Sequence, residues 1–261
     1  MPSWDSTQYL KFRAERQRPA QDLLAGIALQ APDRIFDLGC GAGNPTRLVA
    51  ARWPQARITG LDSSADMLAK ARDGGDDDIE WANIEWVRAN LNSWKSPEPA
   101  DLLYSNAALQ WLGDHETLFP RLMDMLSPGG VLAVQMPRNH AAPSHTCMFD
   151  AICAGPWATK FPAEREAAPV AAPETYYSIL APVAGRLSIW ETIYHQVLEG
   201  ENPVVEFTRG TALRPILEKL DENERAGFLE EYSARILAAY PPQADGKTLF
   251  PFRRLFIVAY G

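Results

Sequence analysis

The segment IFDLGCGAGNPT, residues 35–46, decides the fold of this 261-residue chain. It reads as a short apolar strand that ends in the carboxylate of Asp37, followed by a loop and the start of a helix. Three loop glycines can adopt backbone angles that side chains forbid, so a ligand can lie directly on the main chain: Gly39, Gly41 and Gly43. With Asn44 as N-cap and Pro45 as first helical residue, the free N–H groups of the helix would point at that ligand.

The order of the loop residues narrows the class of ligand. A dinucleotide-binding loop needs G-x-G-x-x-G, but position 44 is asparagine, and no G-x-x-x-x-G-K-[ST] phosphate loop is present. A carboxylate at the strand end would repel a pyrophosphate, whereas it suits the ammonium and sulfonium groups of S-adenosylmethionine. Asp62 ends the next predicted strand, residues 56–62, where it can accept hydrogen bonds from two ribose hydroxyls.

Strands and helices alternate along the first half of the chain, which is typical of right-handed βαβ units. We therefore predict an α/β fold with a Rossmann-like, doubly wound, seven-stranded and mostly parallel sheet. The predicted strands are 35–37, 56–62, 84–87, 102–105, 131–136, 187–197 and 255–260. The predicted helices include 45–52, one from residue 64, 117–126, 204–220 and 222–240.

We expect a single domain over residues 1–261, with N-terminal helices and an inserted helical cap. Two short N-terminal helices should meet at Arg18-Pro19, because the residue before proline disfavours a helix. The expected parts are an N-terminal helical lid (1–30), a cofactor-binding core (31–137), substrate cap insertions (138–185 and 200–250) and the last two strands (186–199 and 251–261).

Composition excludes several classes of function. The formal charge of −8 and the isoelectric point near 5.1 argue against a nucleic-acid partner, which usually needs a basic face. The sequence contains no run of about 18 apolar residues, so we expect no membrane span. The N-terminal residues lack the apolar core of a secretory signal. Cys40, Cys147 and Cys153 form neither a disulfide framework nor a metal-binding spacing, so we expect a cytoplasmic protein without a metal site.

The glycine motif together with Asp62 resembles the cofactor motif of class I S-adenosylmethionine-dependent methyltransferases. Further segments resemble the trans-aconitate 2-methyltransferase family within that superfamily, so the similarity covers nearly the whole chain. These segments are 4–19, 52–60, 106–112, 131–137, 213–215 and 254–259. One departure is Asn90, where many relatives place an aspartate facing the adenine amino group, and an amide oxygen can accept the same hydrogen bond.

The resemblance implies transfer of a methyl group to a carboxylate of trans-aconitate, which gives its monomethyl ester. A carboxylate is already ionised at pH 7, so we expect no catalytic base, only positioning and removal of water. The expected cofactor-binding residues are Asp37, Gly39, Gly41, Gly43, Asp62, Ser63, Met67, Asn90, Leu91, Trp94, Asn106 and Arg16. The expected residues for the small tricarboxylic acid are Tyr9, Gln110, Trp111, Arg138, Tyr177 and Arg214. Three other arginines are interpreted as surface or structural charges: Arg209, Arg253 and Arg254.

Two other hypotheses stay open at this point. The acceptor could be another acid, such as a malonyl group on a carrier protein, although a carrier partner would favour a basic rim. The chain could also bind the cofactor without transferring its methyl group. The sequence does not determine the oligomeric state, and we expect a monomer.

Overall fold

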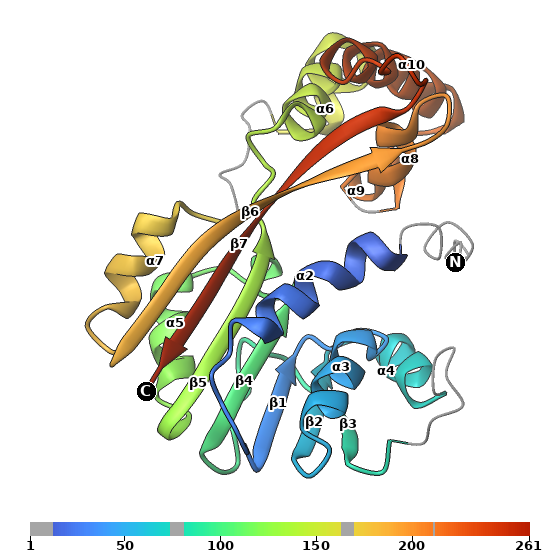
Figure 1. The fold of residues 1–261 in the computed structure, drawn as a ribbon. Coiled ribbons are helices and arrows are strands. Elements are labelled where there is room, and N and C mark those ends of the chain that lie inside the picture. Colours follow the sequence, from blue (N-terminus) through green and yellow to red (C-terminus); the bar gives the residue numbers. More distant parts are fainter. Residues whose placement is uncertain (1–12, 74–80, 163–169, 211) are drawn as a thin grey trace. The chain divides into compact units, whose positions relative to one another are not determined.

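The computed structural model describes residues 13–73, 81–162, 170–210 and 212–261 (Figure 1). The chain forms two compact units. The first, called the sheet unit, comprises residues 14–137, 169–192 and 254–261; the second, called the helical unit, comprises residues 1–13, 138–168 and 193–253. No helix in the described ranges is long and apolar enough to cross a membrane.

The sheet unit is built on a seven-stranded sheet in the order β3-β2-β1-β4-β5-β7-β6. Strands β1 to β5 pair in parallel, and β7 runs antiparallel to β5. This confirms the predicted fold class. The strands are β1 (Arg34–Leu38), β2 (Arg57–Asp62), β3 (Ile84–Arg88), β4 (Ala100–Asn106), β5 (Leu126–Pro137), β6 (Arg186–Leu198) and β7 (Thr248–Tyr260).

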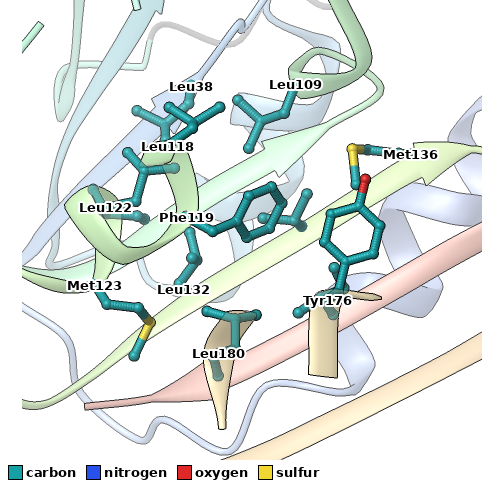
Figure 2. Packing of buried hydrophobic residues seen from close by; sticks show 14 of the residues in the cluster. Leu38, Leu109, Leu118, Phe119, Leu122, Met123, Leu132, Met136, Tyr176 and Leu180 are labelled. Atoms are coloured by element: carbon teal, nitrogen blue, oxygen red, sulfur yellow. The ribbon is translucent and has the colours of Figure 1, made fainter. Parts of the chain in front are cut away.

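Helices cover both faces of this sheet. On one face, α5 and α7 pack on the alternate apolar residues of β1, β4, β5 and β7, and Figure 2 shows Phe119 and Tyr176 in that core. On the other face, the Tyr104 hydroxyl of β4 donates to the Ala20 carbonyl of α2. The helices of this unit are α2 (Arg13–Ala25), α3 (Asn44–Arg52), α4 (Ala65–Arg72), η1 (Leu109–Trp111), α5 (His115–Met123) and α7 (Pro173–Leu180).

The helical unit has a hydrophobic core of its own. Phe228 and Tyr232 of α10 are fully buried there, together with Phe250 from the first half of β7. Asp221 and Glu224 form a capping box at the start of α10, which satisfies two backbone N–H groups. The helices are α6 (Pro143–Ala154), η2 (Pro156–Lys160), α8 (Pro203–Arg209), α9 (Arg214–Leu217) and α10 (Glu222–Ala239).

Several predicted boundaries were wrong. Helix α2 continues through Pro19 instead of breaking there, and burial of Ala20, Leu23 and Leu24 on its inner face offsets the lost backbone hydrogen bond. The predicted helix 204–220 is divided into α8 and α9. Helix α5 ends at residue 123, and β5 already begins at residue 126, where Leu126 pairs with Ala100 of β4. Tertiary pairing therefore overrides the local turn signal of residues 127–130.

Strand β7 also begins earlier than predicted, at residue 248 instead of 251 or 255. Thr248 and Phe250 are buried there, so the first half of the strand belongs to the core of the helical unit. Pro251 can remain in this part of the strand because the ladder to β5 begins only at Arg254.

Candidate active site

The loop between β1 and α3 uses its three glycines in two different ways. All three have left-handed backbone angles, with φ values of 83°, 54° and 82° for Gly39, Gly41 and Gly43. A Cβ atom at Gly39 would lie 2.2 Å from Ala108 Cβ, and one at Gly43 would lie 2.5 Å from Trp86 Cη2. At Gly41 an added Cβ meets no atom of the described chain within 4 Å. Two glycines therefore allow close packing, and Gly41 alone leaves space for a ligand on the main chain.

The start of α3 differs from the sequence prediction. Gly43, not Asn44, is the N-cap, and it makes no side-chain capping bond. Its left-handed conformation turns the chain into the helix, so Asn44 becomes the first helical residue. The buried side chain of Arg47 donates to the carbonyls of Ala42 (3.1 Å) and Ala71 (2.7 Å), which ties the loop to α4. The sequence analysis did not predict these two hydrogen bonds, because an arginine one turn into a helix gives no signal of burial.

Asp62 fixes the loop from the end of β2. Its Oδ2 accepts a hydrogen bond from the Gly41 N–H at 2.9 Å, and its Oδ1 accepts one from the Ser64 N–H at 2.8 Å. A carboxylate has about four acceptor sites, so these two bonds leave capacity for two hydroxyl donors. Asp62 is half-buried, as a residue that positions the loop and accepts from a ligand would be.

Asp37 lies at the end of β1 and is only 1% exposed. Its Oδ2 accepts from the Thr46 hydroxyl at 2.6 Å, whereas its buried Oδ1 has no hydrogen-bond partner among the described residues. Burial raises the pKa of Asp37 from 3.8 to about 7; the bond from Thr46 opposes this rise, and the charge of Asp62 adds to it. A buried carboxylate with an unpartnered oxygen fits a cationic ligand group, so the site suits the charged end of S-adenosylmethionine.

The loop after β3 lies beside the glycine loop. Leu91 Cδ1 would be 4.0 Å from a Cβ at Gly39, and Trp94 packs on Phe36 with ring centroids 5.2 Å apart. Arg121 of α5 donates to the carbonyls of Trp94 and Leu91 and so holds this segment, a role that the sequence analysis missed. The exposed side chain of Asn90 accepts from the Asn92 N–H through Oδ1.

The remaining predicted cofactor residues flank this edge of the sheet. Ser63 is exposed, and Met67 is half-buried on α4, where its N–H donates to the Ser64 hydroxyl. Asn106 ends β4, and its buried Oδ1 has no partner in the part of the chain that the structure describes. The side chain of Arg16 lies outside the described residues, so its role stays a prediction.

The structure distributes the predicted acid-binding residues over both units. In the sheet unit Gln110 is buried and donates to the Ala107 carbonyl at 2.7 Å, while Trp111 and Tyr177 are 76% and 61% exposed. In the helical unit Arg138 is half-buried, and the exposed Arg214 pairs with Glu218 at 2.8 Å. Tyr9 lies outside the described residues. Substrate contact by these six residues stays a prediction.

Two further residues stand out that the sequence analysis did not select. His115 contacts the Tyr176 hydroxyl at 2.7 Å and the Leu109 carbonyl at 3.0 Å, which fixes η1 after β4. Arg254, which the sequence analysis interpreted as a surface or structural charge, is 7% exposed, and its Nη1 donates to Gln135 Oε1 at 3.2 Å. Residues 255–259 are fully buried on both faces of the strand, so no alternation of apolar and polar residues could have indicated the burial of Arg254.

Comparison with known proteins places this arrangement in a family. The methyltransferase domain family matches residues 35–130. The YcgJ protein of Bacillus subtilis has a TM-score of 0.59 at 12% identity, covering 94% of this chain and 98% of its own. A phosphoethanolamine N-methyltransferase of Haemonchus contortus, solved with S-adenosylmethionine, has a TM-score of 0.52 at 16% identity, covering 93% of this chain and 52% of its own. At these identities the two structures show a shared fold.

Similarity to named proteins extends over almost the full length. A trans-aconitate 2-methyltransferase of Azoarcus sp. strain BH72 is 50% identical over 259 residues, which is 99% of either chain. Proteins of the same name from Rhodopseudomonas palustris strain BisB18 and Afipia carboxidovorans are each 47% identical, again over 99% of either chain. The chain therefore belongs to the trans-aconitate 2-methyltransferase family of S-adenosylmethionine-dependent methyltransferases.

Proposed function

We propose that this protein transfers the methyl group of S-adenosylmethionine to one carboxylate of trans-aconitate, which yields the monomethyl ester. Asp37 carries this proposal, because a buried carboxylate whose Oδ1 has no partner among the described residues is suited to a cationic group. Family membership indicates the acid, since the three relatives described above are named for trans-aconitate. None of those three is named for a carrier protein, and no feature of the described residues favours that alternative.

The residues present fit the cofactor along the carboxyl ends of β1, β2 and β4. Asp62 would accept from ribose hydroxyls, with its two existing bonds holding the carboxylate in place. Asp37 and Asn106 offer acceptor oxygens for the ammonium of the methionine end. Gly41 gives the ligand access to the backbone. Leu91 and Met67 are half-buried apolar residues near this edge and would line the adenine.

The reaction needs no protein base. Bound S-adenosylmethionine supplies a methyl group on a cationic sulfur. An ionised carboxylate oxygen of the acid bonds to the methyl carbon while the carbon–sulfur bond breaks, and the sulfur keeps the electron pair of that bond. No proton moves, so the protein contributes alignment and the exclusion of water. Correct alignment alone can lower a barrier by roughly 7–11 kcal/mol. The protein must also bind the remaining carboxylates, because a chain of formal charge −8 repels a tricarboxylate in general. We further propose that the protein acts in the cytoplasm as a monomer.

Transfer of a labelled methyl group tests this function directly. The protein would be incubated with methyl-labelled S-adenosylmethionine and, separately, with trans-aconitate, cis-aconitate, citrate and a malonyl carrier protein. We expect label in a base-labile ester of trans-aconitate, with one S-adenosylhomocysteine formed per ester. Label on the carrier or on another acid, without label on trans-aconitate, would contradict the substrate. Cofactor binding without any transfer would contradict the enzyme.

A further inference from the structure

Four polar residues form a row across the sheet unit, on the face that α2 covers. The strands β1, β4, β5 and β7 are neighbours, and their register places Asp37, Asn106, Gln135 and Arg254 on the same face at one end of the sheet. We call these four residues the polar row. Adjacent strands are about 4.8 Å apart, so the row crosses about 14 Å of sheet from β1 to β7. It runs diagonally, because Asp37 is in register with Tyr104 of β4 and Arg254 is in register with Pro137 of β5.

The two ends of the polar row have opposite chemistry. Asp37 and Asn106 each have a buried acceptor oxygen, Oδ1, that has no hydrogen-bond partner among the described residues. Gln135 is 0% exposed, and its Nε2, a donor, has no partner among the same residues. Arg254, beside it, is a buried guanidinium. The β1 end therefore suits a cation and the β7 end an anion.

Arg254 fixes which way the Gln135 amide points. A guanidinium has only donors, so the amide oxygen must face the Arg254 Nη1 that lies 3.2 Å away. The Nε2 donor must then point away from Arg254, although it lies in a buried position. An unsatisfied buried donor costs about 1–3 kcal/mol, which a bound acceptor would recover. The pair thus has the form of a carboxylate receptor built from one charged and one neutral donor.

We propose that Gln135 and Arg254 bind one carboxylate of the acid substrate and that a different carboxylate receives the methyl group. This inference rests on the proposed function and names a part of its acid-binding site. A carboxylate held by a guanidinium and an amide N–H is a poor nucleophile, because its lone pairs are engaged. The anchored carboxylate therefore survives in the product. Since Gln135 is fully buried, the side chains around it must move when the acid binds.

The test uses the full-length protein and three variants. Arg254→Gln removes the charge, and Gln135→Glu keeps a partner for Arg254 but puts a negative charge where the acid carboxylate would bind. Arg253→Gln is the matched control, because Arg253 is the adjacent arginine on β7 and its side chain is exposed. Calorimetry would measure binding of trans-aconitate to the S-adenosylhomocysteine complex, and binding of S-adenosylhomocysteine itself. Initial rates would give KM and kcat.

We expect Arg254→Gln and Gln135→Glu to weaken acid binding about 100-fold, in line with the loss of charge-assisted hydrogen bonds. Arg254→Gln should bind S-adenosylhomocysteine within about threefold of the wild type, because Arg254 on β7 is two strands away from Asn106 on β4. Arg253→Gln should match the wild type in every measurement. If Arg254→Gln fails to fold, as thermal unfolding would reveal, Gln135→Glu decides the question alone.

Product inhibition distinguishes whether the carboxylate bound by Gln135 and Arg254 is the one that is methylated. The monomethyl ester made by the wild type should inhibit it, and Arg254→Gln should weaken this inhibition by the same factor as acid binding. Inhibition unaffected by Arg254→Gln would mean that the anchored carboxylate is the methylated one. Acid binding within threefold of the wild type in both variants, while the wild type methylates trans-aconitate, would overturn the inference and leave the proposed function standing. No methylation by the wild type would overturn both.

Discussion

The two ends of the polar row differ in how the chain assembles them. At the Asp37 end, the glycine loop, Thr46 and Asp62 lie within 26 residues of one another and are linked by hydrogen bonds that the carboxylates of Asp37 and Asp62 accept. At the Arg254 end, the contact joins Gln135 and Arg254, which are 119 residues apart in the sequence. The cofactor end is therefore a local motif, whereas the acid end depends on the antiparallel pairing of β7 with β5.

This difference gives a physical reason why the two ends of the polar row can vary independently. The glycine loop, Asp37 and Asp62 fix one another's geometry through short-range contacts, so this motif can remain the same when distant residues change. Residues on β7 can change without disturbing that motif, because β7 is three strands away from β1. We therefore expect variants at the cofactor end to affect cofactor binding and variants at the acid end to affect acid binding, and the following predictions test this separation.

The largest effect on cofactor affinity is expected for Asp62→Ala. This change removes the acceptor for the Gly41 and Ser64 N–H groups as well as the proposed ribose contact. Charge-assisted hydrogen bonds of this kind predict that the Kd for S-adenosylhomocysteine rises about 100-fold or more. Calorimetry measures it, with Asp66→Ala, an exposed aspartate of α4, as control. A rise in acid KM of similar size at saturating cofactor would contradict the separation of the two ends.

Alanine variants of Gly43 and Gly41 should distinguish a glycine needed for packing from one needed for ligand contact. Gly43→Ala places a Cβ 2.5 Å from Trp86 and should lower the free energy of unfolding by about 2–4 kcal/mol. Gly41→Ala meets no described atom and should lower it by only about 1 kcal/mol. Urea denaturation gives both values.

A matched control isolates the ligand contact of Gly41. Gly246 also has a left-handed φ and no described atom near an added Cβ, so Gly246→Ala should lose similar stability without any loss of cofactor affinity. Gly41→Ala should weaken S-adenosylhomocysteine binding roughly tenfold, because the new methyl group occupies the ligand's approach. Equal cofactor affinity in the two variants would show that the ligand does not lie over Gly41.

The pH dependence of cofactor binding should report Asp37. Its folded pKa of about 7 is raised above 3.8, so S-adenosylmethionine, which favours the carboxylate form, must displace a proton at pH 6 but not at pH 8. Affinity should therefore rise about tenfold from pH 6 to pH 8. In Asp37→Asn this rise should vanish. A pH-independent affinity in the wild type would contradict the assignment.

The same raised pKa predicts the stability of the protein without ligand. Between pH 4 and 7 the folded state holds the Asp37 proton more tightly than the unfolded chain does, so unfolding free energy falls as pH rises through this window. The contribution is at most about 4 kcal/mol, at about 1.4 kcal/mol per pH unit. Asp37→Asn should remove that fall, and urea denaturation at several pH values measures it.

The smallest effect on cofactor affinity is expected for Tyr176, outside the polar row. Tyr176→Phe removes the hydroxyl that contacts His115 Nδ1 at 2.7 Å and accepts from the Ala171 N–H at 3.3 Å. We expect a loss of about 1–2 kcal/mol in unfolding free energy. Cofactor affinity should stay the same, because the hydroxyl lies in the core on the α5 side of the sheet. Calorimetry that showed weaker cofactor binding would link that core to the site.

Much of the fold could be predicted because its signals are local. Apolar runs that end in Asp37 and Asp62 identified β1 and β2. The alternation of strands and helices predicted a doubly wound sheet, which the observed strand order confirms. The missed features depend on partners far away in the sequence. Helix α2 runs through Pro19 because its inner face is buried, and β5 begins early because Leu126 pairs with Ala100. Neither partner is visible in a short window of sequence.

The sequence alone determined the cofactor class, because a loop of alternate glycines between two carboxylates carries its own geometry in consecutive residues. It also determined the family, through segments spread along the chain. Three features depend on tertiary packing: which glycine is open, the burial that raises the pKa of Asp37, and the position of Arg254 as a buried cation beside Gln135. Burial and cross-strand neighbours depend on how the whole chain packs, and no local pattern specifies them.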